Sequence, residues 1–136
     1  PEVWRSNQLR RGIERECGEL LDPELFSLWP DQLTTPQKYD LIYTRVLLQK
    51  PKVIFCVQPF QGADMELRMR IWNHLKRLQE QGTALVILAV NLADSLSLAH
   101  QLIRIHRGGP HEYYSREDFS RLSDTTPWAD FYQHFG

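Results

Sequence analysis

Two short apolar segments, with an amphipathic helix between them, constrain the fold of this chain most. The segments "KVIFCV" (52–57) and "ALVILAV" (84–90) are rich in β-branched residues and lack polar alternation, which is typical of parallel strands covered on both faces. Between them, one face of a helix is marked by Leu67, Ile71, Leu75 and Leu78. Spacings of three and four predict an amphipathic helix packed on two buried strands.

Turn residues fix the ends of this helix, and the pattern continues after it. Asp64 is placed to cap a helix that runs to about Gln81, and Gly82 follows as the stop. A short helix over 92–99 and a third strand, "QLIRIHRG" (101–108), come next. Strand, helix, strand, helix, strand with short connections predicts a right-handed parallel α/β unit.

The N-terminal third reads as two helices around an irregular connection. The first predicted helix, 5–21, has an apolar face made of Leu9, Ile13, Cys17 and Leu20. The connection contains prolines and acids, and we expect three of its residues to pack inward: Phe26, Trp29 and Leu33. The second helix begins near Thr35, with Pro36 in its first turn, and ends before Pro51.

Composition favours one soluble globular domain and gives no global hint of a partner. The 136 residues include 16 Lys and Arg against 17 Asp and Glu, so the net charge of -1 creates no field that attracts nucleic acid or an anionic membrane. The longest apolar run, 84–90, is far below the roughly 20 residues of a membrane-spanning helix. Two cysteines without metal spacing, and no secretory signal, indicate a reduced, cytosolic protein.

This sequence lacks the two common nucleotide-binding motifs. No glycine is followed by lysine, so a phosphate-binding loop of the G-x-x-x-x-G-K-[ST] type is absent. A G-x-G-x-x-G fingerprint is absent as well. A metal site at His100, His106 and His111 is weakly supported, because no acid or cysteine completes a ligand spacing. No strand-turn-helix elbow surrounds a serine, which argues against a hydrolase.

Residues 33–108 resemble the second half of an ATP-binding cassette (ABC) domain, most of all the second cassette of simple-sugar and nucleoside importers. The family's phrases "LSGGNQQK", "LILDEP", "RGID", "EQG" and "DRILVMREG" correspond in order and spacing to "LTTPQKYD", "IFCVQP", "QGAD", "EQG" and "HQLIRIHRG". The resemblance implies an α/β fold with a partial P-loop NTPase-like parallel sheet, the C-terminal half of a nucleotide-binding domain. It divides the chain into a helical segment (1–32), the α/β core (33–109) and an aromatic-rich segment (110–136).

The departures from the family fall on its reactive positions. Where the signature serine and glycines contact ATP of the opposite cassette, this chain has Thr34, Thr35 and Pro36, followed by Gln37. Thr34 keeps a hydroxyl, but Pro36 lacks an N–H and Thr35 has a side chain where a close approach needs none. The signature-like residues Thr34, Thr35 and Gln37 are therefore a weakened phosphate contact.

The three positions of the family's hydrolytic chemistry are also replaced. The aspartate that orders magnesium corresponds to Val57, which has no lone pair for a hard cation. The glutamate that acts on the attacking water corresponds to Gln58, which cannot take a proton. The switch histidine corresponds to Val90. Asp64, in the family's dimer-contacting loop, is retained as an interface residue.

The resemblance implies a degenerate, non-hydrolysing segment of an ABC importer ATP-binding subunit. It would act through dimerisation with another cassette and coupling to membrane subunits, in the cytoplasm or peripherally on the inner face of the membrane. Alone it would need no cofactor, and ATP with magnesium would bind only at a composite site with a partner. Two alternatives remain: an α/β interaction module that binds a protein through its aromatic C-terminal segment, and an active ATPase completed in trans through Thr34.

Overall fold

The computed structural model describes residues 8, 11–12, 15, 21–90 and 92–122. Its elements are η1 (Pro23–Ser27), η2 (Pro30–Gln32), α2 (Thr35–Gln49), β1 (Val53–Val57), α3 (Met65–Glu80), β2 (Ala84–Leu88), α4 (Ala93–Leu96), β3 (Gln101–Arg104), β4 (Glu112–Ser115), η3 (Arg116–Asp118) and α5 (Phe119–Leu122). They form two compact units, the first of residues 1–54 and 63–85, the second of residues 55–62 and 86–136. No described helix is long and apolar enough to cross a membrane.

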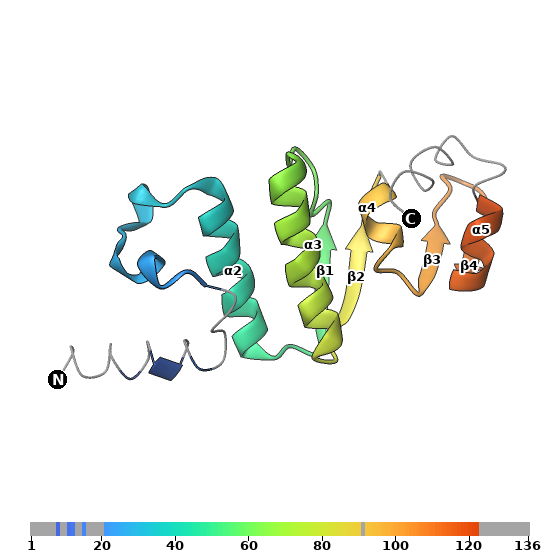
Figure 1. Cartoon of the computed structure of the whole chain (residues 1–136). Helices are drawn as coiled ribbons and strands as arrows, with labels where there is room; N and C mark the ends of the chain where they lie inside the picture. The colour runs from blue at the N-terminus through green and yellow to red at the C-terminus, as the bar shows by residue number, and fades with distance from the viewer. Residues whose placement is uncertain (1–7, 9–10, 13–14, 16–20, 91, 123–136) are drawn as a thin grey trace. The chain divides into compact units, whose positions relative to one another are not determined.

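The two long helices of the first unit, α2 and α3, lie where the sequence predicts them and pack against each other (Figure 1). Asp64 caps α3 by accepting a hydrogen bond from the Leu67 N–H at 2.9 Å, which confirms its predicted role as a helix cap. The predicted stripe of α3 is buried, with Ile71 and Leu75 fully enclosed. The apolar periodicity of α3 therefore identified the core of this unit correctly.

Strands β1 and β2 form a two-stranded parallel sheet, as expected from their apolar sequences (Figure 1). At one end the Ala84 N–H donates to the Lys52 carbonyl at 2.8 Å, and at the other the Gln58 N–H donates to the Leu88 carbonyl at 2.7 Å. Cys56 is buried, and burial raises the pKa of its thiol. The parallel pair that the sequence predicts is thus present.

The expectation that both faces of these strands are covered is wrong for the described residues. The side chains alternate along β1, and Phe55 and Val57 are 71% and 70% exposed. Val86 and Leu88 of β2 are exposed as well. We call Phe55, Val57, Val86 and Leu88 the open sheet face, and all four belong to the second unit. An apolar run without alternation predicts two faces that avoid water, but it cannot say which residues cover each one.

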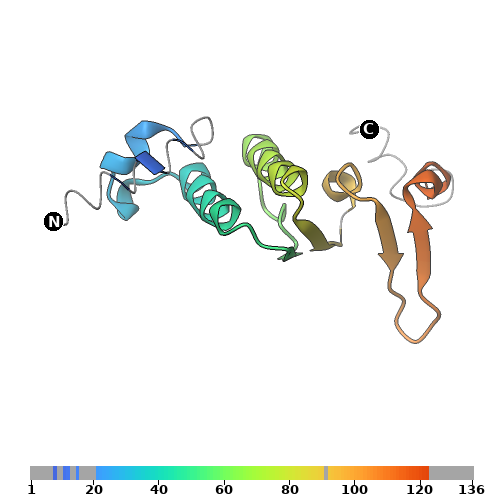
Figure 2. The same cartoon turned by 90° about the horizontal axis from the view of Figure 1, so that it is seen from below.

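The third predicted strand forms, but it does not extend a parallel sheet. β3 pairs antiparallel with β4 in a separate sheet, in the register Leu102 to Tyr114 and Ile103 to Tyr113 (Figure 2). Only a short connection joins the two strands, and it contains Gly108 at a positive φ of 73°. So short a connection allows a hairpin but not a parallel crossover. Since β3 belongs to this hairpin sheet and is not hydrogen-bonded to β1 or β2, the prediction of three parallel strands is wrong.

A small core in the second unit includes part of the aromatic segment. Leu96 of α4 and Phe119 of α5 are buried together, and four partly buried residues pack on them: Leu92, Ala99, Leu102 and Tyr114. Tyr114 and Phe119 thus dock on the rest of their own unit. The aromatic residues Trp128, Phe131, Tyr132 and Phe135 lie outside the described residues.

The N-terminal predictions are tested only in part. Within the predicted helix 5–21, Gln8, Arg11, Gly12 and Arg15 are helical, whereas Leu21, the last predicted residue, lies in a bend. The other residues of this span lie outside the described ones. In the connection after it, the inward packing expected of Trp29 is wrong, because its side chain is 72% exposed. Trp29 caps the short η2 helix with extended backbone, and its N–H donates to the Gln32 Oε1 at 2.9 Å. Leu33 is half-buried.

One polar atom in the α2–α3 interface has no hydrogen-bond partner in the part of the chain that the structure describes. Thr44 is 2% exposed, and its Oγ1 is buried without a partner. Burial of an unpaired hydroxyl costs about 1–3 kcal/mol in proteins. We therefore expect Thr44→Val, which replaces the hydroxyl by a methyl group, to raise the free energy of unfolding by about 1 kcal/mol.

Urea unfolding followed by circular dichroism measures this change. Thr35→Val is the matched control, because Thr35 is exposed at the start of the same helix and should change stability by less than about 0.5 kcal/mol. A Thr44→Val variant less stable than the natural chain would mean that the hydroxyl has a partner after all.

Candidate functional site

The positions predicted from the resemblance to match the family's catalytic groups lie where two parallel strands end. Val57 is the last residue of β1, and Gln58 follows it. The hydrogen bond from the Gln58 N–H to the Leu88 carbonyl holds this turn beside the end of β2, two residues before Val90. The structure therefore brings Val57, Gln58 and Val90 to the same edge of the β1–β2 sheet.

None of these three side chains supplies acid, base or metal-binding chemistry. Val57 and Val90 are 70% and 80% exposed and apolar. Gln58 is exposed, with a backbone φ of 45° that residues other than glycine rarely adopt. A carboxamide can hydrogen-bond water but cannot accept its proton at neutral pH. The strand ends thus keep a sharp, locally strained turn, while the side chains on it cannot activate a nucleophile.

The signature-like residues form the N-terminus of α2, where Thr34 and Gln37 are hydrogen-bonded to each other. Thr34 is the N-cap; its hydroxyl accepts from the Gln37 N–H at 3.4 Å, and its own N–H donates to the Gln37 Oε1 at 2.9 Å. Pro36 has no N–H. An anion at this helix end would find one N–H missing and another already bonded, which weakens the usual attraction. Thr34 and Thr35 are exposed.

Asp64 is exposed as well, and its carboxylate is occupied by the cap of α3. It lies in the first unit, with Thr34, Thr35 and Gln37, whereas Val57, Gln58 and Val90 belong to the second.

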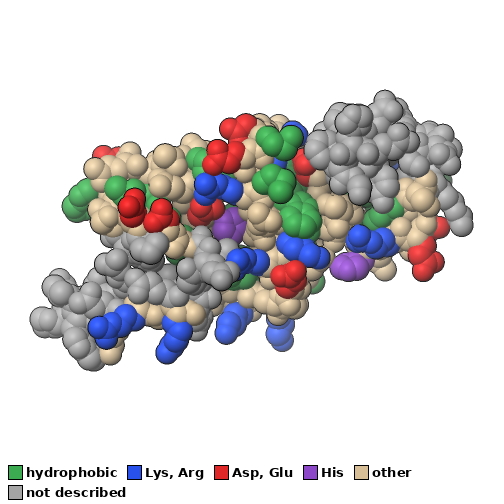
Figure 3. All heavy atoms as spheres, in the orientation of Figure 1, with side chains coloured by type: hydrophobic (Ala, Val, Ile, Leu, Met, Phe, Trp, Pro, Cys, Tyr) green, Lys and Arg blue, Asp and Glu red, His purple; other side chains and the backbone are tan. Residues whose placement is uncertain are grey.

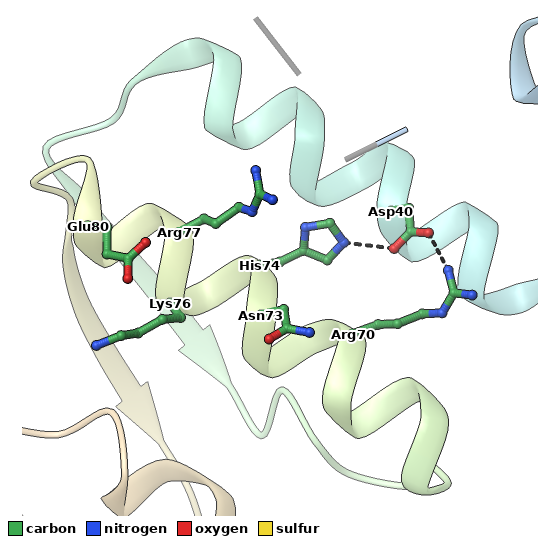
Figure 4. A pocket seen from close by; sticks show the side chains of 7 residues that line it. All are labelled: Asp40, Arg70, Asn73, His74, Lys76, Arg77 and Glu80. Atoms are coloured by element: carbon green, nitrogen blue, oxygen red, sulfur yellow. Dashed lines mark hydrogen bonds and ion pairs between the residues drawn. The ribbon is translucent and has the colours of Figure 1, made fainter. Parts of the chain in front are cut away.

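A buried polar cluster between α2 and α3, absent from the sequence predictions, is the best-formed arrangement of charged groups described. Asp40 accepts from Arg70 Nη1 at 2.6 Å through Oδ2 and contacts His74 Nε2 at 2.7 Å through Oδ1 (Figure 4). The ring of Tyr43 stacks on His74 at 5.2 Å. We call Asp40, Arg70 and His74 the Asp40 cluster. An ionised carboxylate can only accept, so His74 donates through Nε2.

Two features of the sequence agree with this cluster once the partners of Asp40 are known. The family phrase "LSGGNQQK" ends in lysine where "LTTPQKYD" ends in Asp40, a reversal of charge at a helical position. Arg70 and His74 are four residues apart and therefore share a face of α3. A buried acid requires such partners, because its charge is otherwise costly to remove from water.

The described histidines other than His74 show no arrangement for a metal. His106 contacts Glu112 Oε2 at 2.8 Å, and Arg104 lies 3.5 Å from the same oxygen. The hydrogen bond from His106, with smaller contributions from Tyr114 and Arg104, lowers the pKa of Glu112. His100 and His111 are exposed. Over residues 21–90 and 92–122, no group of three or more His, Cys, Asp or Glu side chains could hold a metal ion.

Charge on the surface is mixed. On the face shown in Figure 3, acidic and basic side chains lie among apolar ones. This agrees with the nearly balanced composition.

The Asp40 cluster makes a direct prediction for stability. Asp40→Ala leaves the buried His74 donor without its acceptor and frees Arg70, so we expect a loss of about 1–3 kcal/mol in the free energy of unfolding. Arg70 is 41% exposed, so its share of this cost is reduced by solvent. Asp40→Asn should cost less, because a carboxamide can still bond both partners.

Urea unfolding of the two variants, with Asp31→Ala as an exposed-acid control, measures these differences. Asp31→Ala should change stability by no more than about 0.5 kcal/mol. Equal stability of Asp40→Ala and the natural chain would show that the cluster contributes nothing to the fold.

Comparison with known proteins identifies relatives that are import ATP-binding proteins. The chain is 25% identical over 107 residues to a ribose import ATP-binding protein of Ruegeria sp. (strain TM1040), covering 79% of this chain and 20% of the relative. It is 30% identical over 89 residues to an Fe(3+) ions import ATP-binding protein of Pseudomonas fluorescens, covering 65% and 25%. It is 27% identical over 110 residues to a trehalose/maltose import ATP-binding protein of Thermococcus litoralis, covering 75% of this chain and 30% of the relative.

The chain spans between a fifth and a third of the length of these relatives. No family model matches it. The relatives of this chain are thus ATP-binding subunits of sugar, iron and polyamine importers at low identity, which supports the ABC transporter ATPase family.

Proposed function

We propose that this chain is a degenerate, non-hydrolysing segment of an ABC importer ATP-binding subunit of the simple-sugar or nucleoside type. In this proposal residues 33–109 correspond to the C-terminal half of a cassette core. Residues 1–32 correspond to the end of the helical subdomain, and 110–136 are a C-terminal addition. The segment acts as a structural partner of another cassette and transmits its movement to membrane subunits at the inner face of the membrane.

The observation that carries this proposal is the chemistry of the strand ends. The β1 turn is held beside β2 by the hydrogen bond from Gln58 to Leu88, so the frame of the site persists. The side chains on that frame are Val57, Gln58 and Val90, which offer neither a metal ligand nor a base. A frame that remains after its reactive groups are gone is expected where a paired subunit keeps a mechanical role.

The open sheet face supports the idea that this segment works within a larger assembly. Burying apolar surface contributes roughly 25 cal/mol per Å², so four exposed apolar side chains on adjacent strands favour a covering layer. The relatives are three to five times longer than the region they share with this chain, as the covered fractions of 20% to 34% imply. Such a layer can come from the same polypeptide or from a partner.

Nucleotide, in this proposal, binds only at a composite site. The phosphate-binding loop would belong to another cassette, and Thr34 at the exposed start of α2 would face that ATP. Asp64 would lie at the contact between cassettes. Magnesium would be held by the partner, because Val57 cannot ligate it.

Phosphate release tests the proposal. The purified chain with magnesium ATP should release no phosphate above the uncatalysed background, and Gln58→Glu alone should not change this, because the phosphate-binding loop is still missing. A ribose import ATP-binding protein of the relatives' type serves as the positive control. Release that falls on Gln58→Ala would contradict the proposal, because it would make the carboxamide part of a working site.

A second function, that of a protein-interaction module, is favoured by the outer face of the β3–β4 hairpin. Ile103, Ile105 and Tyr113 are 54%, 70% and 73% exposed, and Ile103 and Tyr113 are direct partners in the strand register. Aromatic and branched side chains of this kind act as anchors in interfaces. This face lies partly in the segment 110–136 that the sequence assigns to partner binding.

Truncation separates the two functions. Removal of residues 123–136 keeps Phe119 in its core, whereas truncation after Gly109 would remove β4 and that core residue, and so would unfold the unit. If the chain is an interaction module that binds through its tail, the protein lacking 123–136 should keep its circular dichroism spectrum and lose its partner in co-purification. Retention of the partner would exclude the tail and leave the hairpin face, which this shortened protein keeps, as the binding surface.

A further inference from the structure

A row of cationic and hydrogen-bonding side chains on α3 faces a pocket beside the Asp40 cluster. Arg70, His74 and Arg77 are spaced by four and three residues and so lie on one face of the helix, towards α2. The pocket has a volume of about 520 Å³, and its lining consists of Asp40, Arg70, Asn73, His74, Lys76, Arg77 and Glu80. Figure 4 shows the Arg77 and His74 side chains on the same side of α3. All of these residues belong to the first unit.

The acids beside the pocket already have partners, or are exposed. Both oxygens of Asp40 are engaged, Oδ2 by Arg70 and Oδ1 by His74. Glu66 binds the other terminal nitrogen of Arg70 at 3.1 Å. Glu80 is exposed at the rim, so solvent and salt screen its repulsion of an anion.

Two charges in the lining have no acid as a recorded partner in the described part of the chain: Lys76, whose ammonium donates to the Gln79 Oε1 at 3.3 Å, and Arg77. Arg77 is the one of the two without a recorded side-chain bond. Its side chain is half-buried, and in the part of the chain that the structure describes it has no recorded ion pair or side-chain hydrogen bond. The carboxamide of Asn73, also in the lining, is likewise without a recorded bond there. A guanidinium presents five N–H donors in a planar fork that matches the oxygens of phosphate.

We propose that this pocket binds a small tetrahedral oxyanion, the class of phosphate and phosphate esters. Arg77 supplies the charge and a two-donor fork, and the Asn73 amide donates a further hydrogen bond. Arg70 adds positive potential while it remains bound to Asp40. Oxyanion binding would fill the pocket between α2 and α3, independently of the strand-end positions Val57, Gln58 and Val90. Whether the pocket prefers free phosphate or a phosphate ester follows from a comparison of its affinities for inorganic phosphate and glycerol phosphate.

A titration with sodium sulfate at constant pH 7 tests the proposal, because sulfate remains a dianion and has the same tetrahedral shape. Binding is followed by nitrogen-15 NMR of the backbone and of the arginine side chains. Sodium chloride at matched ionic strength is the reference for general salt effects. We expect saturable shifts at Asn73, His74 and Arg77 that chloride does not reproduce, and at least tenfold weaker binding by Arg77→Gln, because charge-assisted hydrogen bonds are about twice as strong as neutral ones.

Arg45→Gln is the matched control, since Arg45 is an exposed arginine on α2 outside the pocket lining, and this variant should bind sulfate like the natural chain. Circular dichroism establishes that each variant is folded. Equal sulfate affinity of Arg77→Gln and the natural chain, or shifts that chloride reproduces, would overturn the proposal. Tighter binding of inorganic phosphate than of glycerol phosphate would identify free phosphate as the preferred form, and the reverse order would identify an ester.

Discussion

The burial of one face of α3 is the constraint on which the described fold of the first unit depends. Ile71 and Leu75 are fully enclosed and Leu78 is 1% exposed, so this stripe supplies most of the deeply buried apolar side chains there. Each such side chain contributes roughly 1.5–3 kcal/mol when it leaves water. The Asp40 cluster joins Asp40 of α2 to Arg70 and His74 of this helix, so α2 is held to α3 by apolar packing and by directed polar bonds. Together they hold the N-terminus of α2, which begins with the signature-like residues.

Under the proposed function, this arrangement would explain how reactive groups can be lost without loss of the frame. The turn after β1 depends on a backbone hydrogen bond from Gln58 to Leu88, and such a bond is available to almost any side chain. The chemistry of a nucleotide hydrolase depends instead on the side chains at those positions. If Val57 and Gln58 stand in place of an aspartate and a glutamate, as proposed, function would be removed while the strand pair persists. In these few residues the backbone therefore determines the frame, and the side chains determine the chemistry.

The sequence predicted the helices of the described region better than the pairing of its strands. Periodicity located α3, and the Asp64 cap confirmed its start, because both signals are local. The hairpin of β3 and β4 was missed because "EYYS" follows a glycine-rich connection and is too short to show the alternating pattern that predicts a strand. The open sheet face was missed because an apolar sequence does not reveal what covers it. Pairing and coverage are non-local properties, and one sequence holds little information about them.

The candidate site shows the same division. The strand-end and helix-start positions could be placed from the resemblance, because order and spacing along the chain suffice for that. The Asp40 cluster could not be found in this way, since Asp40 and His74 are 34 residues apart and meet only in the folded protein. The reversal of charge at Asp40 becomes informative only once Arg70 and His74 are known to bond its carboxylate.

The most direct test of the central claim, that this chain retains a cassette frame but no nucleotide site of its own, is its melting temperature with and without magnesium ATP. A ligand at one hundred times its dissociation constant stabilises the folded state by about 2.7 kcal/mol, which corresponds to a rise of several degrees for a chain of this size. We predict that 5 mM magnesium ATP, at constant ionic strength, leaves the melting temperature of the purified chain unchanged within about 0.5 °C, well below the shift that such binding produces. A rise of several degrees that requires magnesium would contradict this account.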